Sequence, residues 1–204
     1  ARELRTVTQA INNMVINLQS TFDSLTKQTQ ALTEEVYIDS LTGLGNRKSF
    51  ENHFNSVVNN ITDDAPITAL MLTLPSLNNI NQVVSYQDGD QHVLDAAKIL
   101  KQLADELPNS TIFRLNGGTF VLLAPYDVLF LNKARLDLID NLSQKENSLH
   151  INGYANLAIV GVEQGASLGE VLSLLDTGCT IGEDTTFDKN DKESLFSVNQ
   201  WRTL

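Results

Sequence analysis

The chain has 204 residues, of which 42% are hydrophobic and only four are proline, a composition typical of a folded globular protein. Its formal net charge of -11 and pI near 4.6 argue against nucleic acid and anionic lipid headgroups as partners, because both require a basic surface. The single cysteine, Cys179, excludes an internal disulfide, and no apolar run is long enough to predict a membrane span.

The first 38 residues carry apolar side chains at alternating spacings of three and four, the pattern of a coiled-coil seam. Two successive spacings of four around Leu18 form a stutter, which locally unwinds a supercoil. The stutter and the polar Thr29 in the seam favour a rod that relays signals by changing its packing. We expect a parallel homodimer, with a helix packed along its own globular domain as the alternative. The seam consists of Leu4, Val7, Ile11, Met14, Leu18, Phe22, Leu25, Leu32 and Val36.

A glycine-containing loop at residues 39–47 separates this helix from a globular part. Asn46 is placed to cap the next helix, and the apolar run at 66–74 predicts a strand buried on both faces. A helix is expected at 89–107. The apolar residues of the two helices are Phe50, Phe54, Val57 and Val58 in the first, and Val93, Ala96, Ala97, Leu100 and Leu103 in the second.

A hairpin is the strongest local signal in the globular part. Two strand-like runs flank residues 116–119, where Asn116-Gly117 predicts the positive φ values of a tight turn. A helix at 128–142, a strand at 154–162, a second helix around Val171 and a short strand at 194–198 complete the pattern. The first of these helices offers Leu131, Leu136, Ile139 and Leu142 as core residues. Together the elements predict an α+β fold with a mixed sheet flanked by helices.

Four short motifs follow one another in this part of the chain: DSLTGLGNR at residues 39–47, Asn81 with Gly89-Asp90, RLNGGTF at 114–120 and AIVG at 158–161. In this order they resemble the DxLTGLxNR motif, the stretch after the first strand, the RxGGDEF hairpin and the SIGVA strand of GGDEF domains, the fold of diguanylate cyclases. The resemblance spans residues 39–198. It implies a nucleotidyl-cyclase-like sheet preceded by a long coiled-coil helix, with domains at 1–38 and 39–204.

The departures from the family pattern affect its chemistry. In working members, two GTP molecules are joined by a two-metal phosphoryl transfer, and an Asp at the end of the first strand and an acidic pair in the hairpin hold the metals. Those positions here are Thr73, Gly118 and Thr119, which offer no carboxylate to a hard divalent ion. We therefore expect no metal, no cofactor and no cyclase activity. The signature hairpin keeps its turn through Asn116, Gly117, Gly118, Thr119 and Phe120.

The resemblance also implies changes at two ligand sites of the family. The product-inhibition motif RxxD reads Leu107-Pro108-Asn109-Ser110 here, so the inhibitory site is lost at Leu107 and Ser110. Asn81 and Asp90 correspond to the guanine-binding pair and are read as vestigial, with helix capping as the alternative role of Asp90. A phosphate-contacting lysine of the family aligns loosely with Glu183.

Several other polar residues are expected to be structural. Arg114 is read as a solvated strand residue, with an acidic partner as the alternative. Arg47 and Lys48 are read as a surface pair at the start of a helix. The three histidines, His53, His92 and His150, show no metal-ligand spacing and are expected to be surface or core residues, and Cys179 is expected to be a buried small side chain.

A long signalling helix before a degenerate GGDEF domain resembles the LapD-type receptors of the GGDEF–EAL family, which control biofilm adhesion. That resemblance implies a membrane-anchored HAMP module upstream, an EAL domain of the same chain that binds c-di-GMP, and a cytoplasmic position in a bacterial inner-membrane protein. The chain itself would relay signals as a homodimer without catalysis. A GTP-sensing regulatory domain and a protein-recruiting adaptor are the alternatives.

Overall fold

The structure is a computed structural model that describes residues 2–62, 64–181 and 186–187. The chain divides into two compact units, residues 1–38 and residues 39–204. Among the described residues, no helix combines the length and hydropathy that crossing a bilayer requires.

The first unit is one continuous helix, α1 (Arg2–Tyr37), as the apolar spacing predicts. Three seam residues in its middle, Met14, Leu18 and Phe22, have exposed fractions of 65%, 62% and 71% in the single chain. A row of exposed apolar side chains is unfavourable in water. The helix therefore offers an apolar stripe of the kind that coiled-coil partners cover.

The second unit is built on a six-stranded mixed sheet with the order β1-β3-β4-β2-β5-β6. The central strand β2 pairs antiparallel with β4 and β5, β3 pairs antiparallel with β4, and the edge strands β1 and β6 are parallel to their neighbours. The predicted mixed sheet is confirmed. The strands are β1 (Gly45–Asn46), β2 (Ile67–Thr73), β3 (Thr111–Asn116), β4 (Thr119–Ala124), β5 (Asn156–Val162) and β6 (Thr186–Phe187).

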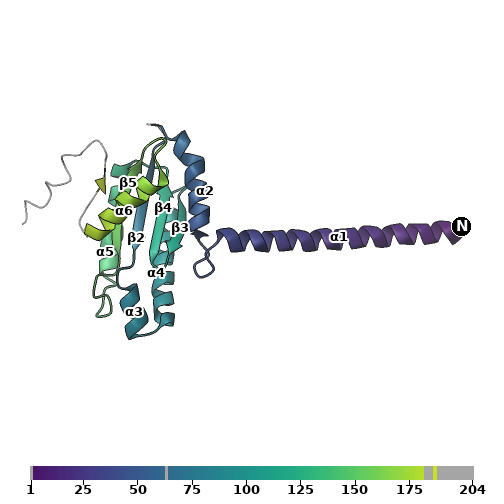
Figure 1. Cartoon of the computed structure of the whole chain (residues 1–204), viewed down its shortest axis with the longest axis horizontal. Coiled ribbons are helices and arrows are strands. Elements are labelled where there is room, and N and C mark those ends of the chain that lie inside the picture. The colour runs from purple at the N-terminus through teal and green to yellow at the C-terminus, as the bar shows by residue number, and fades with distance from the viewer. Residues whose placement is uncertain (1, 63, 182–185, 188–204) are drawn as a thin grey trace, which may run out of the picture. The chain divides into compact units, whose positions relative to one another are not determined.

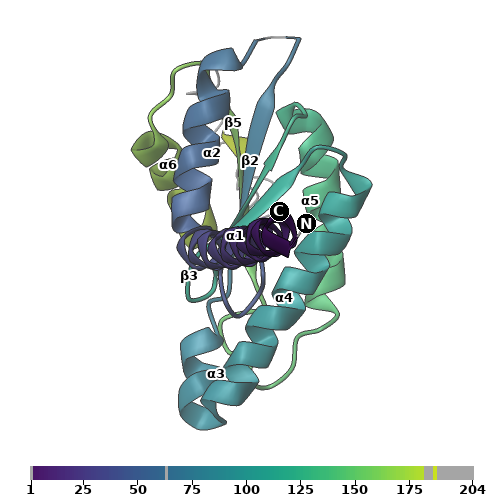
Figure 2. The same cartoon turned by 90° about the vertical axis from the view of Figure 1, so that its right-hand side faces the viewer.

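Helices cover both faces of this sheet (Figures 1 and 2). On one face, α2 and α6 pack over a cluster that includes Phe50, Phe54 and Leu175. On the other face, α4 and α5 pack over a cluster that includes Leu100 and Leu131. The helices are α2 (Arg47–Val57), α3 (Leu77–Val83), α4 (Tyr86–Glu106), α5 (Val128–Ser143) and α6 (Leu168–Ile181), and a short 3-10 turn, η1 (Val58–Asn60), follows α2.

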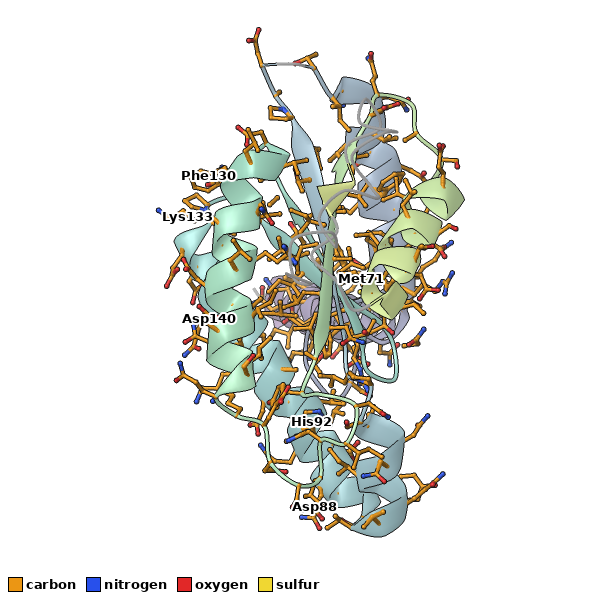
Figure 3. The ribbon with its side chains drawn as sticks, turned by 90° about the vertical axis from the view of Figure 1, so that its left-hand side faces the viewer. Met71, Asp88, His92, Phe130, Lys133 and Asp140 are labelled. Carbon is orange, nitrogen blue, oxygen red and sulfur yellow. The ribbon has the colours of Figure 1, made fainter. Side chains whose placement is uncertain are left out.

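Strand β2 shows why this sequence forms a two-sided core. Successive side chains of a strand point to opposite faces, so Ala69 and Met71 enter the α2/α6 layer while Leu70 and Leu72 enter the α4/α5 layer. All four are buried, and Figure 3 shows Met71 beside α6. The nearly continuous apolar run predicted this central position.

Several predicted details are wrong. The helix expected at 89–107 forms as α4 but begins three residues earlier, at Tyr86, where the side chain of Ser85 accepts a hydrogen bond from the Asp88 amide. Asp90 therefore lies inside α4 and does not cap it. The short helix α3 before it was not predicted. Leu136, expected in the core, is 42% exposed, because α5 turns it away from the sheet.

The hairpin forms where predicted, but its turn does not use positive φ values. Among the described residues, the glycines with positive φ are Gly43, Gly153 and Gly165, and Asn109 is the one such non-glycine residue. The register of β3 against β4 shifts between Arg114 and Asn116, and this irregularity closes the hairpin without a left-handed residue. The strand expected at 194–198 and Glu183 lie outside the described residues.

Candidate functional site

The loop that opens the second unit is held by its first carboxylate. Asp39 accepts hydrogen bonds from the Thr42 amide (2.9 Å) and the Thr42 hydroxyl (2.7 Å). It also forms an ion pair with Arg114, whose Nη1 donates to both carboxylate oxygens at 2.9 and 3.1 Å. Lys101 of α4 donates to the Thr42 carbonyl at 3.0 Å. The loop is thus bound to both β3 and α4.

Arg114 extends this network to the hairpin turn. Its Nε and Nη2 donate to the Gly117 carbonyl at 3.0 and 2.8 Å, so one guanidinium joins the loop to the turn. The main expectation for Arg114, a solvated strand residue, is wrong, since its side chain is only 13% exposed. The alternative, an acidic partner, is the one that the structure shows. Charge-assisted hydrogen bonds are stronger than neutral ones, and here the guanidinium uses Nη1 for the carboxylate and Nε and Nη2 for the carbonyl, so its position is set from both sides.

The ion pair changes the titration of Asp39. Burial by itself raises the pKa of this carboxyl, but the hydrogen bonds from Thr42 and Arg114 outweigh burial, and the pKa lies below the ordinary 3.8. A carboxyl whose pKa is lower in the folded than in the unfolded chain stabilises the fold at pH values above its unfolded pKa. That stability is lost as the pH falls through the folded pKa.

A shallow cavity of about 390 Å³ adjoins this network. Arg47, predicted to be a surface residue, is exposed and pairs with Glu51 across one helical turn at 3.3 Å. Neighbouring Lys48 is also exposed. The cavity is lined by Asp39, Asn46, Arg47, Lys48, Arg114, Leu115, Asn116 and Gly117.

The residues at the family's metal-binding positions meet at one end of the sheet. Thr73 ends β2 and pairs with Thr119 of β4 and Asn156 of β5. The structure therefore brings Thr73, Thr119 and Gly118 together, as the sequence positions imply. Their side chains offer two hydroxyls and no carboxylate. Behind them lies Cys179 on α6, whose pKa burial raises to about 11, so the thiol is neutral.

Two leucines fill the space beside the hairpin, a feature that sequence reasoning missed. The Leu74 amide donates to the Gly118 carbonyl at 2.9 Å. A Cβ on Gly118 would stand 2.9 Å from the Leu74 Cβ and 3.1 Å from a Leu77 methyl. The first separation is shorter than real Cβ contacts and the second is unusually tight, so a side chain at this position would displace the leucines. The available signal was the pair of apolar residues at 74 and 77, directly after the strand that ends at Thr73.

Asn81 and Asp90 lie at the junction of α3 and α4. A Cβ on Gly89 would collide with the Asn81 carboxamide, so the glycine allows α3 to pack tightly against α4. Asp90, which follows Gly89 in α4, is exposed. The Asn81 side chain thus lies against α4 at Gly89, the residue that precedes Asp90.

The position of the lost inhibitory motif is apolar and neutral. Leu107 is 4% exposed and caps the C-terminus of α4, and the buried Ser110 hydroxyl has no hydrogen-bond partner among the described residues. Asn109 between them adopts a left-handed φ of 65°. No guanidinium or carboxylate stands at either end of the motif.

Comparison with known proteins decides the family. The sequence profile described as "Diguanylate cyclase, GGDEF domain" matches residues 36–177. The chain belongs to the GGDEF family. Among curated proteins, it is 25% identical over 129 residues to the diguanylate cyclase VdcA of Vibrio cholerae, covering 63% of this chain and 37% of that protein. It is 37% identical over 82 residues to an uncharacterized membrane protein of Staphylococcus epidermidis, covering 39% and 22%. The chain spans well under half the length of these relatives.

Solved GGDEF structures share this fold. The coiled coil and GGDEF domain of DgcB from Caulobacter crescentus, in complex with c-di-GMP, has a TM-score of 0.74 at 14% identity and covers 87% of this chain and 99% of that one. The S helix-GGDEF-EAL portion of Vibrio cholerae LapD, bound to c-di-GMP, has a TM-score of 0.64 at 22% identity and covers 78% and 37%. At these identities the likeness shows the GGDEF fold alone.

The Asp39–Arg114 pair gives a first prediction. Asp39→Asn should lower the free energy of unfolding by about 1–2 kcal/mol at pH 7, because the variant loses charge-assisted hydrogen bonds. The difference from the wild-type protein should shrink as the pH falls below 3.8 and the wild-type carboxyl gains its own proton. Urea denaturation at pH 7 and at lower pH measures both. A difference that stays constant with pH would contradict this role.

The packing beside Gly118 gives a second prediction, with a matched control one residue away. Gly118→Asp should destabilise the domain by about 1–3 kcal/mol, because its side chain would overlap Leu74. Gly117→Asp should be nearly neutral, since no atom lies within 4 Å of a Cβ there. Thermal and urea denaturation compare the two variants. Equal stability of both would show that the leucines leave room for the side chain.

Proposed function

We propose that this chain is a catalytically inactive GGDEF domain that relays signals in a transmembrane c-di-GMP receptor controlling biofilm or cell adhesion. The receptor would bind c-di-GMP through an EAL domain outside these 204 residues. The chain would act as a homodimer on the cytoplasmic side of a bacterial inner membrane, below a HAMP module. The observation that carries the proposal is the neutral composition of the three positions where the family binds metal.

The chemistry of phosphoryl transfer supports inactivity. Mg²⁺ requires hard oxygen ligands, and carboxylates supply the charge that holds it beside a triphosphate. Thr73 and Thr119 provide hydroxyls only, and Gly118 provides no side chain. Leu74 and Leu77 occupy the adjoining space. The three positions therefore lack the negative charge that would hold a metal-bound triphosphate, and a longer side chain at Gly118 would meet these leucines.

The network around Asp39 supports a relay. Asp39 stands two residues after the end of α1 at Tyr37, so a rotation or register change of the helix reaches it through the chain. From Asp39, the guanidinium of Arg114 continues to the Gly117 carbonyl in the hairpin. A short polar chain thus connects the end of the helix with the altered signature turn.

The exposed seam of α1 and the similar proteins support the proposed homodimer and the proposed EAL domain. DgcB pairs a coiled coil with a GGDEF domain, and the LapD structure places an S helix, a GGDEF domain and an EAL domain in one chain bound to c-di-GMP. By analogy, the long helix here would join two copies and a following EAL domain would hold the ligand.

One retained feature favours a second function. Asn81 and Asp90 keep the residue types of the guanine-binding pair at the α3–α4 junction. A domain that binds GTP without turning it over would act as a nucleotide sensor. Isothermal titration with GTP and Mg²⁺ separates the two functions, because saturable heat in the micromolar range would favour the sensor and no heat would favour the relay.

The inactive site predicts the outcome of a cyclase assay. With GTP and either Mg²⁺ or Mn²⁺, the chain should form no c-di-GMP above a control without enzyme, because no carboxylate anchors the metals. An active GGDEF cyclase run in parallel verifies the assay. Product formation above the control would refute the proposal of inactivity.

The seam predicts how the oligomeric state responds to charge. Leu18→Glu combined with Phe22→Glu should raise the dimer dissociation constant by roughly 100-fold or more, because each carboxylate would be buried unpaired in the seam. Ser20→Glu combined with Ser24→Glu has the same spacing on the outer face and should leave the dimer intact. Analytical ultracentrifugation measures all three proteins. A monomeric wild-type chain, or equal effects of both pairs, would contradict a coiled-coil dimer.

A further inference from the structure

Three rings from two distant parts of the chain, α4 and the segment before β5, form a compact cluster. The ring centroid of His92 lies 4.9 Å from His150 and 4.6 Å from Tyr154, and His150 lies 4.8 Å from Tyr154. His92 belongs to α4, whereas His150 and Tyr154 lie in the connection between α5 and β5. Figure 3 shows His92 on α4 beside this connection. The sequence analysis expected these histidines to be surface or core residues and did not predict that two of them meet.

His92 occupies an environment that suits only its neutral form. Its residue is 6% exposed, and its Nε2 atom has no hydrogen-bond partner among the described residues. The ring of Tyr154 meets it edge-on. Protonation would add a positive charge and leave both ring nitrogens as N–H donors. The N–H at Nε2 would have no acceptor, which makes the buried charged form unfavourable.

The same connection is tied to α3 by three hydrogen bonds. The Ser76 hydroxyl, which is fully buried, donates to the Gly153 carbonyl at 2.9 Å and accepts from the Asn152 amide at 3.0 Å. The Asn79 carboxamide donates to the Leu149 carbonyl at 3.0 Å. Residues 147–154, which we call the α3 clasp, therefore hold α3 in place from outside.

We propose that the cluster of His92, His150 and Tyr154 is a proton-sensitive latch that keeps the α3 clasp against α3 and α4 while both imidazoles are neutral and releases it when His92 is protonated. A released clasp would loosen Ser76 and Asn79, and with them the helix that carries Leu77 and Asn81. The latch rests on the geometry of the second unit and does not depend on the proposed relay function.

The direction of the pH response follows from the titration of the two imidazoles. Burial, together with the nearby charge of His150, lowers the pKa of His92 from 6.5 to about 4, and Asp95 and a backbone hydrogen bond at Tyr154 oppose this only in part. Burial also lowers the pKa of His150, against the influence of Glu146. Because the open clasp takes up protons more readily than the closed one, the latch is stable above pH 6.5 and weakens as the pH falls toward 4.

The charged neighbours come from each element around the cluster. On α4, Asp95 faces His92, and Asp88, one turn before His92, accepts a hydrogen bond from the Ser85 hydroxyl. Lys98 and Lys145 line the adjoining groove with Asp95. In the connection, Glu146 accepts a hydrogen bond from the Tyr154 amide at 3.1 Å, and burial raises the pKa of the Tyr154 hydroxyl to about 12, so it stays neutral. Helix α3 carries no titratable side chain.

Hydrogen exchange of the clasp tests the latch on the whole chain. Once rates are corrected for intrinsic exchange, the opening constant of the amides of residues 149–154 should rise roughly 30-fold between pH 7.5 and pH 5.0, as expected for a histidine pKa of about 4 when closed and 6.5 when open. In His92→Phe, which keeps an aromatic ring but cannot be protonated, the rise should be less than roughly 3-fold.

His53→Phe is the matched control. His53 is the remaining histidine, it packs against Phe113 on the opposite face of the sheet, and burial also lowers its pKa. This variant should keep the full pH response of the clasp. A wild-type clasp whose opening is independent of pH would overturn the proposal, as would a pH response that survives in His92→Phe or disappears in His53→Phe.

A direct titration keeps the proposal testable if His92→Phe does not fold. Two-dimensional NMR of the histidine side chains in the wild-type protein should show His92 neutral at pH 5.5 while the clasp remains protected. A His92 imidazole that titrates near 6.5 with the clasp still protected would overturn the latch.

Discussion

The signature hairpin is held in place by contacts that require no metal ion. On one side, Arg114 binds the Gly117 carbonyl and the Asp39 carboxylate together. On the other side, the Leu74 amide binds the Gly118 carbonyl, and the two residues are too close for a side chain on the glycine. Because these contacts are a guanidinium pair and apolar packing, the hairpin keeps its shape although its acidic residues are absent.

This arrangement connects the hairpin to two other segments of the chain. Through Arg114 it is linked to Asp39 and so to the segment that follows α1. Through Leu77 it contacts α3, whose first turn is fastened at Ser76 to the α3 clasp. If the domain is inactive, as we propose, its hairpin still has two polar attachments, one through Arg114 to Asp39 and one through α3 and Ser76 to the α3 clasp. A hairpin attached in this way is suited to transmitting a change of packing, which is the role that we propose.

The sequence predicted the elements better than the contacts between them. The apolar run of β2 and the hairpin strands were evident because local periodicity and turn residues encode them. The predicted cap is confirmed too, since the Asn46 side chain accepts a hydrogen bond from the Ser49 amide at the start of α2. Helix α3 was missed because its seven residues are mostly polar and too short to show a period. The pairing of Asp39 with Arg114, 75 residues apart, and of His92 with His150 depends on the folded sheet, and one sequence contains no signal for such distant partners. The motif positions at Thr73, Gly118 and Thr119 were identified from the family resemblance, whereas the leucine packing beside them required the structure.

The most direct test of an inactive site is a crystal of the chain soaked with Mn²⁺ and a non-hydrolysable GTP analogue. Anomalous scattering locates Mn²⁺ without reference to the surrounding density. The account predicts no anomalous peak beside Thr73 and Thr119, and leucine side chains unchanged at 74 and 77. Two ions bound there with an ordered triphosphate would contradict the claim that this GGDEF site has lost its chemistry.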